Sequence, residues 1–219
     1  HGLSSWTCVH LSRIGDQILQ KGDLMAKQVE FYFDFVSPTT YLAYTQLSKI
    51  AQRTGAEIVY KPFLLGGVFK ASGNQTPMAV PAKGAWMAKD MDRFAKRYGV
   101  DMVFNPYFPI NSINIMRGAV WAEEQGFLEK YCDIMFKAMW VDQVNLGDAE
   151  EVAKLLGNTE INLAQFQAAV SDQSIKDKLR ATTEEAAARG AFGAPTMFVG
   201  EEMFFGQDRL DFVEEALLV

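Results

Sequence analysis

Residues 29–40 read VEFYFDFVSPTT, and this stretch decides the fold. Its first eight residues are mostly β-branched or aromatic, a composition that favours a buried strand over 29–36. Ser37 has a side chain that often caps a helix N-terminus, and Pro38 suits the first helical position. The stretch therefore predicts a strand that passes directly into a helix.

The residues that follow extend this start into a βαβ unit. Apolar residues recur at helical spacing over 38–53, and Thr54-Gly55 ends the predicted helix. Residues 56–63 (AEIVYKPF) indicate a second strand. Because a strand, a helix and a strand in one sheet almost always make a right-handed crossover, we expect the two strands to be parallel.

The middle of the chain is predicted to be helical, and its end returns to a sheet. Apolar residues at helical spacing predict helices over 84–98, 113–125, 127–140, 148–156, 163–170 and 174–189. The Gly-, Pro- and Asn-rich segments over 64–83 and 105–112 are predicted to be long loops with a functional role. A hairpin of strands over 196–199 and 203–205 and a helix over 207–218 complete the chain.

This order, βαβ, helices and then ββα, predicts an α/β thioredoxin-like fold with an inserted all-helical domain. We expect residues 25–66 and 190–219 to form the thioredoxin-like domain and residues 67–189 the inserted helical domain. Residues 1–24 are interpreted as a leader or a vector-derived extension, and an N-terminal arm packed on the domain is the alternative. They lack the basic start, apolar middle and cleavage site of a secretory signal.

Composition limits the classes of partner. The 219 residues include 21 basic and 27 acidic side chains, for a net charge of −6. A mildly acidic chain without a basic run repels nucleic-acid phosphates, so we expect no nucleic-acid partner. The apolar stretches are shorter than the ~20 residues that span a bilayer, so we expect no membrane partner. No disulfide framework is indicated, and this favours the cytoplasm.

The distribution of histidine and cysteine excludes several chemistries. Both histidines and one cysteine lie within the first ten residues, so the chain from Met25 onward has no histidine and a single cysteine, Cys132. That part therefore has no Ser-His-Asp or Cys-His catalysis, no histidine-rich metal site and no two-cysteine redox centre. We expect no metal, and we expect Cys132 to pack as a small hydrophobe.

Ser37 is the candidate catalytic residue. In a thioredoxin-like βαβ unit the reactive site lies where the helix begins, and the free amides and dipole there favour an anion. A redox enzyme would have C-x-x-C at this point, but here Ser37 and Thr40 occupy the two cysteine positions. A serine hydroxyl does not transfer electrons, yet it can stabilise a thiolate that a ligand brings. The alternative is a plain helix cap.

Other candidate residues lie in the segments flanking the sheet. Thioredoxin-like proteins often have a cis-proline facing the helix start, and we expect Pro195 to be one, with Ala194 presenting its backbone to an extended ligand. A trans turn proline is the alternative. The remaining candidates are polar side chains suited to carboxylate or ammonium groups of a ligand: Asn74, Lys83, Asp208 and Arg209. For Asp208 and Arg209 the alternative is a capping aspartate beside a solvated arginine.

Together these segments resemble the 2-hydroxychromene-2-carboxylate isomerases and kappa-class glutathione transferases, which have the DsbA-type thioredoxin-like fold. The matching segments occur in order from residue 33 to residue 209: FDFVSPTTY (33–41), SGNQTPMAVPAKG (72–84), KLRATT (178–183), GAFGAPT (190–196) and GQDR (206–209). In the family the serine motif often continues with an aromatic residue and a second serine, whereas this chain has Thr39-Thr40.

The resemblance implies glutathione as the cofactor, with Ser37 holding its sulfur. It implies that Ala194 pairs through its backbone with the cysteinyl residue, ahead of a cis-Pro195. It also implies a homodimer. The remaining implied roles are binding of the glycyl and peptide region and of the γ-glutamyl end, by Asn74 with Lys83 and by Asp208 with Arg209 respectively.

The family's isomerase activity implies reversible addition of the glutathione thiolate to a conjugated carbon of a small aromatic substrate, as in aromatic-compound catabolism. Candidate substrate-binding residues are Asn114 and Arg117, for which a solvated or capping role is the alternative. Trp86 is a candidate in an aromatic pocket that also includes Tyr107, Phe108 and Trp140, for which a place in the core is the alternative. Three other activities are weighed: a transferase that keeps the conjugate, a non-catalytic glutathione- or peptide-binding module, and a disulfide oxidoreductase, which the missing cysteines disfavour.

Overall fold

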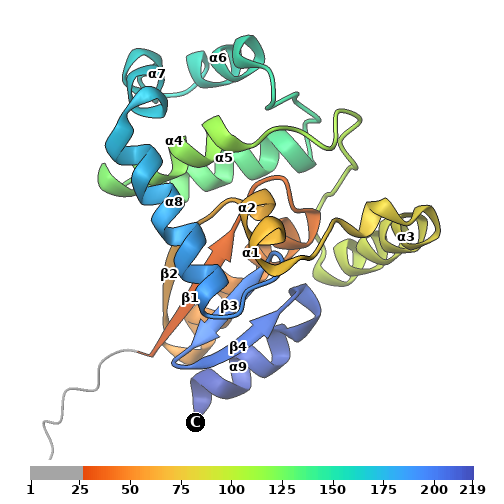
Figure 1. Cartoon of the computed structure of the whole chain (residues 1–219). Helices are drawn as coiled ribbons and strands as arrows, with labels where there is room; N and C mark the ends of the chain where they lie inside the picture. The colour runs from red at the N-terminus through yellow and green to blue at the C-terminus, as the bar shows by residue number, and fades with distance from the viewer. Residues whose placement is uncertain (1–26) are drawn as a thin grey trace, which may run out of the picture.

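A four-stranded sheet lies between two layers of helices in the computed structural model, which describes residues 27–219 (Figure 1). Its strand order is β2-β1-β3-β4. β1 (Gln28–Phe33) pairs in parallel with β2 (Glu57–Pro62) and antiparallel with β3 (Thr196–Val199). β3 pairs antiparallel with β4 (Glu202–Phe205). The parallel pair and the final hairpin confirm the predicted α/β thioredoxin-like fold.

The two faces of the sheet are covered by different helices, because successive residues of a strand point to opposite sides. Phe31 and Phe33 are fully buried in the core shared with α1 (Pro38–Thr54) and α9 (Leu210–Leu218). Tyr32 and Phe198 point the other way, into a second cluster that includes residues of α2 (Leu65–Ser72) and α8 (Gln173–Ala188). The sheet is therefore buried on both faces.

The central helices confirm the predicted series. They are α3 (Pro81–Tyr98), α4 (Ile113–Glu124), α5 (Leu128–Trp140), α6 (Ala149–Gly157) and α7 (Leu163–Ser171). α4 to α7 gather beyond one end of the sheet, and α8 runs from them back to its face (Figure 1). Phe35, just after β1, packs edge-on against Phe136 of α5 with ring centroids 4.8 Å apart. The sheet and the helical series therefore share one core.

The structure differs from the sequence prediction on both sides of the first crossover. β1 ends at Phe33 rather than at residue 36, because the Asp34 carboxylate accepts the Val36 amide at 3.1 Å and turns the chain. The predicted loop over 64–83 contains α2, a 3₁₀ turn (Pro77–Ala79) and the first residues of α3. Sequence periodicity does not indicate α2, because its second and third residues are Gly66 and Gly67 and glycine disfavours helix.

Two further predictions concern the ends of the chain, and one concerns membrane spans. The final helix is divided into a 3₁₀ turn (Gln207–Arg209) and α9, which begins at Leu210. The interpretation of residues 1–24 as an extension lies outside the described residues. Within residues 27–219 the helices are all too short or too polar to cross a bilayer.

Candidate functional site

Ser37 is the N-cap residue of α1 and follows β1 after a short turn. Its Oγ accepts a hydrogen bond from the Thr40 backbone amide at 3.2 Å, and Pro38 occupies the first helical position as predicted. The first turn of α1 contains no acidic side chain, so the positive end of the helix dipole is not neutralised within the helix. An anion at this point would meet the dipole and the serine hydroxyl together.

The peptide bond between Ala194 and Pro195 is cis, as predicted, and faces this helix start. The Ser37 hydroxyl donates to the Ala194 carbonyl oxygen at 3.2 Å, and the Thr39 hydroxyl donates to the same oxygen at 3.1 Å. Within residues 27–219 the backbone amide of Ala194 makes no hydrogen bond. The residue before the cis-proline therefore keeps one backbone donor for an extended ligand.

Thr40 occupies the second position at which a redox enzyme would have cysteine. Its side chain is fully buried, and its Oγ1 has no hydrogen-bond partner among the described residues. Ser37 is also buried, with 4% of its surface exposed. Both positions of the motif are therefore occupied by hydroxyl side chains that are shielded from solvent.

Two other loops meet at the cis-proline. The Asn74 side-chain amide, which follows α2, donates to the Phe192 carbonyl oxygen at 2.8 Å. The Gly206 amide, which follows β4, donates to the Pro195 carbonyl oxygen at 3.0 Å. Gly206 has φ of 97°, a conformation that glycine adopts without strain. The structure therefore brings Asn74 and the 206–209 segment to the same loop as Ala194.

An aromatic pair flanks the cis-proline loop. The rings of Phe192 and Phe205 lie 4.6 Å apart, and 37% and 40% of their surfaces are exposed. A Cβ at Gly193 would lie 2.7 Å from the Phe205 ring, so only glycine permits this close approach. The pair presents an apolar surface beside the polar helix start.

Asp208 and Arg209 lie in the 3₁₀ turn that follows Gly206. The Asp208 carboxylate accepts from the Arg209 guanidinium at 2.8 Å, and about half of each side chain is exposed. Lys83 lies in the first turn of α3, exposed and without an ion pair among residues 27–219. The described contacts do not connect Lys83 to the cis-proline loop.

Comparison with known proteins shows which family has this fold and sequence. The DsbA-like thioredoxin domain matches residues 28–218. The chain belongs to the DsbA-like thioredoxin family. This DsbA-like protein is 33% identical, over 89% of its length and 100% of the relative, to the 2-hydroxychromene-2-carboxylate isomerase of Sphingobium xenophagum. The solved structure of a 2-hydroxychromene-2-carboxylate isomerase superposes with a TM-score of 0.78 at 32% identity, covering 87% of this chain and 94% of that one.

Kappa-class transferases are more distant relatives of this DsbA-like protein. Glutathione S-transferase kappa 1 of Rattus norvegicus is 28% identical over 84% of this chain and 87% of its own. The resemblance to both groups, isomerases and kappa transferases, is therefore confirmed, and the relatives named are enzymes.

Of the three residues predicted to bind substrate, Asn114 and Arg117 are neighbours on α4, whereas Trp86 lies on α3. The Arg117 guanidinium donates to the Val170 carbonyl oxygen at 3.2 Å and to the Asn114 side chain at 3.4 Å, so it connects α4 to α7. Trp86 lies on α3 with 58% of its surface exposed. No described contact joins these residues to Ser37.

Part of the predicted aromatic pocket is core. Trp140 is fully buried, and its indole donates to the Phe35 carbonyl oxygen at 2.8 Å. Phe108 packs on it with ring centroids 6.1 Å apart, while Tyr107 is exposed. For Trp140 the core role is therefore confirmed and the pocket role is not, because its ring is enclosed within the fold. Cys132 is also fully buried, which confirms its packing role, and burial raises its pKa well above the usual range.

Sequence reasoning missed Asp34, three residues before Ser37. Its carboxylate is 1% exposed, and burial raises its pKa to about 6. It accepts hydrogen bonds from the backbone amides of Val36 and Leu65 and from the Ser112 hydroxyl. The signal was a lone carboxylate within an aromatic strand sequence, FYFDF.

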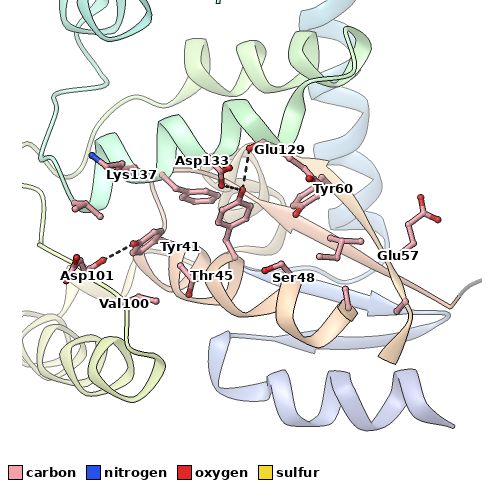
Figure 2. Close-up of a pocket in the computed structure, with 16 residues that line it drawn as sticks. Tyr41, Thr45, Ser48, Glu57, Tyr60, Val100, Asp101, Glu129, Asp133 and Lys137 are labelled. Atoms are coloured by element: carbon pink, nitrogen blue, oxygen red, sulfur yellow. Dashed lines mark hydrogen bonds between the residues drawn. The ribbon is translucent and has the colours of Figure 1, made fainter. Parts of the chain in front are cut away.

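A cleft of about 990 Å³ lies elsewhere, between α1, β2 and α5 (Figure 2). Across it the Tyr41 hydroxyl donates to the Asp101 carbonyl oxygen at 2.8 Å, and the Tyr44 hydroxyl donates to the Asp133 carboxylate at 2.6 Å. Burial, together with this carboxylate, raises the pKa of Tyr44. Neither Ser37 nor the cis-proline loop lines the cleft, so the helix start remains the candidate site.

Proposed function

We propose that this protein is a glutathione-dependent isomerase of the 2-hydroxychromene-2-carboxylate isomerase type. The observation that carries the proposal is the Ser37 hydroxyl at the start of α1, hydrogen-bonded to the residue before a cis-proline. No cysteine occupies either motif position, so a thiol must come from a ligand. The isomerase relatives support the reaction, and the kappa transferases support glutathione as the thiol.

The residues at this site fit an extended thiol peptide. The Ala194 amide has no partner within residues 27–219 and is available to a ligand carbonyl. Thr39 and Ser37 both donate to the Ala194 carbonyl oxygen. Ser37 can therefore turn its proton toward a ligand sulfur while Thr39 keeps that oxygen bonded, so no buried acceptor loses its partner.

Charged and amide side chains suit the two ends of glutathione, and all of them except Lys83 lie at the cis-proline loop or in the 206–209 segment bonded to it. We assign the glycyl and peptide region to Asn74, which already donates to the cis-proline loop, with Lys83 as the cation for the carboxylate. The γ-glutamyl end, which has an ammonium and a carboxylate, is assigned to Asp208 and Arg209. Their exposed ion pair offers both signs of charge at one place.

When bound, glutathione supplies a thiolate that adds reversibly to a conjugated carbon of a small aromatic substrate and lets the former double bond rotate. Ser37 donates a hydrogen bond to the sulfur, which favours the thiolate over the thiol. The unneutralised dipole of α1 acts in the same direction. Asn114, Arg117 and Trp86 stay candidates for substrate binding, and the exposed Phe192 offers an aromatic surface nearer to the cis-proline.

The second candidate is a glutathione transferase, favoured by the 28% identity to a kappa transferase over 84% of the chain. The two activities share the proposed thiol site and differ in the fate of the conjugate. We further propose a cytoplasmic homodimer with a thioredoxin-like domain (25–66 and 190–219) and an inserted helical domain (67–189), acting in aromatic-compound catabolism.

Two measurements test the proposal. The ultraviolet thiolate absorbance of glutathione is followed during titration with the protein near pH 7, for wild type and Ser37→Ala. A thiolate signal that weakens in the variant is expected, and no signal in either protein would refute glutathione activation. The concentration of free glutathione is then measured over many turnovers with 2-hydroxychromene-2-carboxylate as the substrate. An isomerase leaves it constant, whereas a transferase consumes one molecule per turnover.

A further inference from the structure

The Asp34 carboxylate is a buried junction between three segments far apart in sequence. One oxygen accepts from the Val36 amide at 3.1 Å, and the other accepts from the Leu65 amide and the Ser112 hydroxyl, both at 3.0 Å. The side chain is 1% exposed and makes no ion pair with a basic side chain of residues 27–219. Its charge is therefore stabilised by neutral donors alone.

Two of these donors belong to helix starts. Leu65 is the first residue of α2, whose N-cap residue Leu64 has no side-chain acceptor. Ser112 is the N-cap residue of α4, and its side chain makes no capping bond there because it is turned to Asp34. Asp34 thus caps α2 across 31 residues of sequence and places a negative charge near the positive ends of two helices.

The same three segments lead to the proposed site. Val36 immediately precedes Ser37, and the Ser37 amide donates to the Asp34 backbone carbonyl at 3.1 Å. α2 leads to Asn74, which binds the cis-proline loop. α4 begins the helical series beyond the sheet. The carboxylate therefore fixes the turn before Ser37 relative to the elements around it.

We propose that Asp34 is a positioning residue for Ser37, joining the turn that presents the serine to the starts of α2 and α4. The inference rests on the proposed function, because that function gives the Ser37 hydroxyl its role. A protonated carboxyl has one oxygen that must donate, so it can no longer accept from all three donors at full strength. Protonation is therefore expected to loosen the junction.

The positioning role of Asp34 can be tested by changing the pH, because the pKa of its carboxyl lies in an accessible range. Burial raises its pKa to about 6, and the bonds from Leu65, Val36 and Ser112 partly oppose this rise. These are the groups that face the carboxylate from the turn, α2 and α4, and no charged side chain of the described residues contributes to the pKa.

Amide resonances of the full-length protein test the junction directly. Nuclear magnetic resonance spectra are recorded from pH 4.5 to 8 for wild type and Ser112→Ala. In wild type the amide chemical shifts of Val36 and Leu65 are expected to change with pH around one midpoint near 6, as Asp34 titrates. The amide chemical shifts of Ser37 and Thr40 are expected to change with the same midpoint. In Ser112→Ala the common midpoint rises by about half to one pH unit, because one hydrogen bond to the carboxylate is lost.

The matched control is Ser174→Ala, which removes a serine–aspartate hydrogen bond to Asp172 at the start of α8. It should leave the midpoint unchanged. If the amides of Val36 and Leu65 titrate while those of Ser37 and Thr40 do not, the positioning role is wrong. Absence of a common midpoint in wild type would also overturn it, because the carboxylate would not join the segments.

A second variant and a second signal separate this inference from the proposed function. Asp34→Asn places an NH₂ group against a backbone amide, so we expect displaced Ser37 and Thr40 resonances and at least a severalfold weaker glutathione thiolate signal. Wild-type resonances and a wild-type thiolate signal in this variant would refute positioning. If wild type gives no thiolate signal at any pH, the proposed function fails, while the resonance midpoints still decide whether Asp34 is coupled to Ser37.

Discussion

Replacing Ser37 with alanine removes two separable contributions. The first is the cap on α1, because Ser37 Oγ accepts the Thr40 amide at 3.2 Å. Loss of a serine cap lowers the free energy of unfolding by about 1 kcal/mol. The second is the hydrogen bond proposed to reach the ligand sulfur, and a bond to a charged group is worth about 1.5–3 kcal/mol. That loss corresponds to a rise of about one to two in the thiol pKa of bound glutathione and to turnover about 10- to 100-fold slower.

Two further variants separate these contributions. Ser37→Gly removes the same hydroxyl but keeps most of the cap stability, because glycine is tolerated at the N-cap position. Asn162→Ala removes the side-chain cap of α7, where the Asn162 side chain accepts the Gln165 amide at 3.0 Å. Urea unfolding should show similar losses for Ser37→Ala and Asn162→Ala. Only the two Ser37 variants should lose thiolate absorbance near pH 7.

The decisive outcome is the thiolate signal in the glycine variant. If Ser37→Gly and Ser37→Ala both retain the wild-type absorbance with glutathione bound to saturation, the hydroxyl does not stabilise the thiolate. The amides and dipole at the start of α1 would then do so alone. If Asn162→Ala also loses the signal, the effect arises from general destabilisation, and the reasoning from Ser37 fails.

Three other outcomes follow from the structure. Asn74→Ala removes one hydrogen bond to the cis-proline loop and should weaken glutathione binding about two- to tenfold by calorimetry. The control is Asn158→Ala, whose bond lies within α6, and equal weakening there would contradict the assignment. Gly118→Ala places a Cβ 2.2 Å from a tyrosine hydroxyl and should cost about 1–3 kcal/mol or more in urea unfolding, whereas Gly157→Ala meets nothing within 4 Å and should cost little. Burial raises the pKa of Asp34 from 3.8 to about 6, so its contribution to stability is fully present below pH 3.8 and is lost as pH rises through 6, about 3 kcal/mol in all. Between pH 4.5 and 7.5 the free energy of unfolding of wild type should fall by about 2 kcal/mol, because pH 4.5 already lies above 3.8, and that of Asp34→Asn should not. Equal pH dependence of the two proteins would refute this reasoning.

The junction of β1 and α1 could be predicted because its causes are local. A run of β-branched and aromatic residues makes the strand, and Ser37 with Pro38 makes the cap and first turn of the helix. The cis-proline at 195 was predictable from its place before β3 in the expected strand order. These features depend on neighbouring residues and on topology, both of which are visible in a sequence.

Features that depend on distant partners could not be predicted in this way. Two of the donors to Asp34 lie 31 and 78 residues away, so only the folded chain shows why a carboxylate directly follows an aromatic strand. Arg117 has helical spacing from Asn114, yet its guanidinium binds the Val170 carbonyl 53 residues away rather than a site near Ser37. The sequence left Trp140 open to a pocket or a core role, and the structure places it in the core, where its indole N–H donates to the Phe35 carbonyl oxygen.

The pair of hydroxyls at the two motif positions determines what this DsbA-like fold can do. Disulfide exchange needs two sulfurs within reach of each other, and Ser37 and Thr40 provide none. Within residues 27–219 the single thiol is Cys132, which is shielded from solvent and whose pKa is raised by that burial, so it is less readily ionised than an exposed thiol. Thiol chemistry at the start of α1 therefore requires a thiol from a ligand, and the part that we propose for the protein is electrostatic. In the proposed mechanism Ser37 donates a hydrogen bond to the ligand sulfur and α1 adds its dipole. Thr39 leaves Ser37 free to turn because it also donates to the Ala194 carbonyl oxygen.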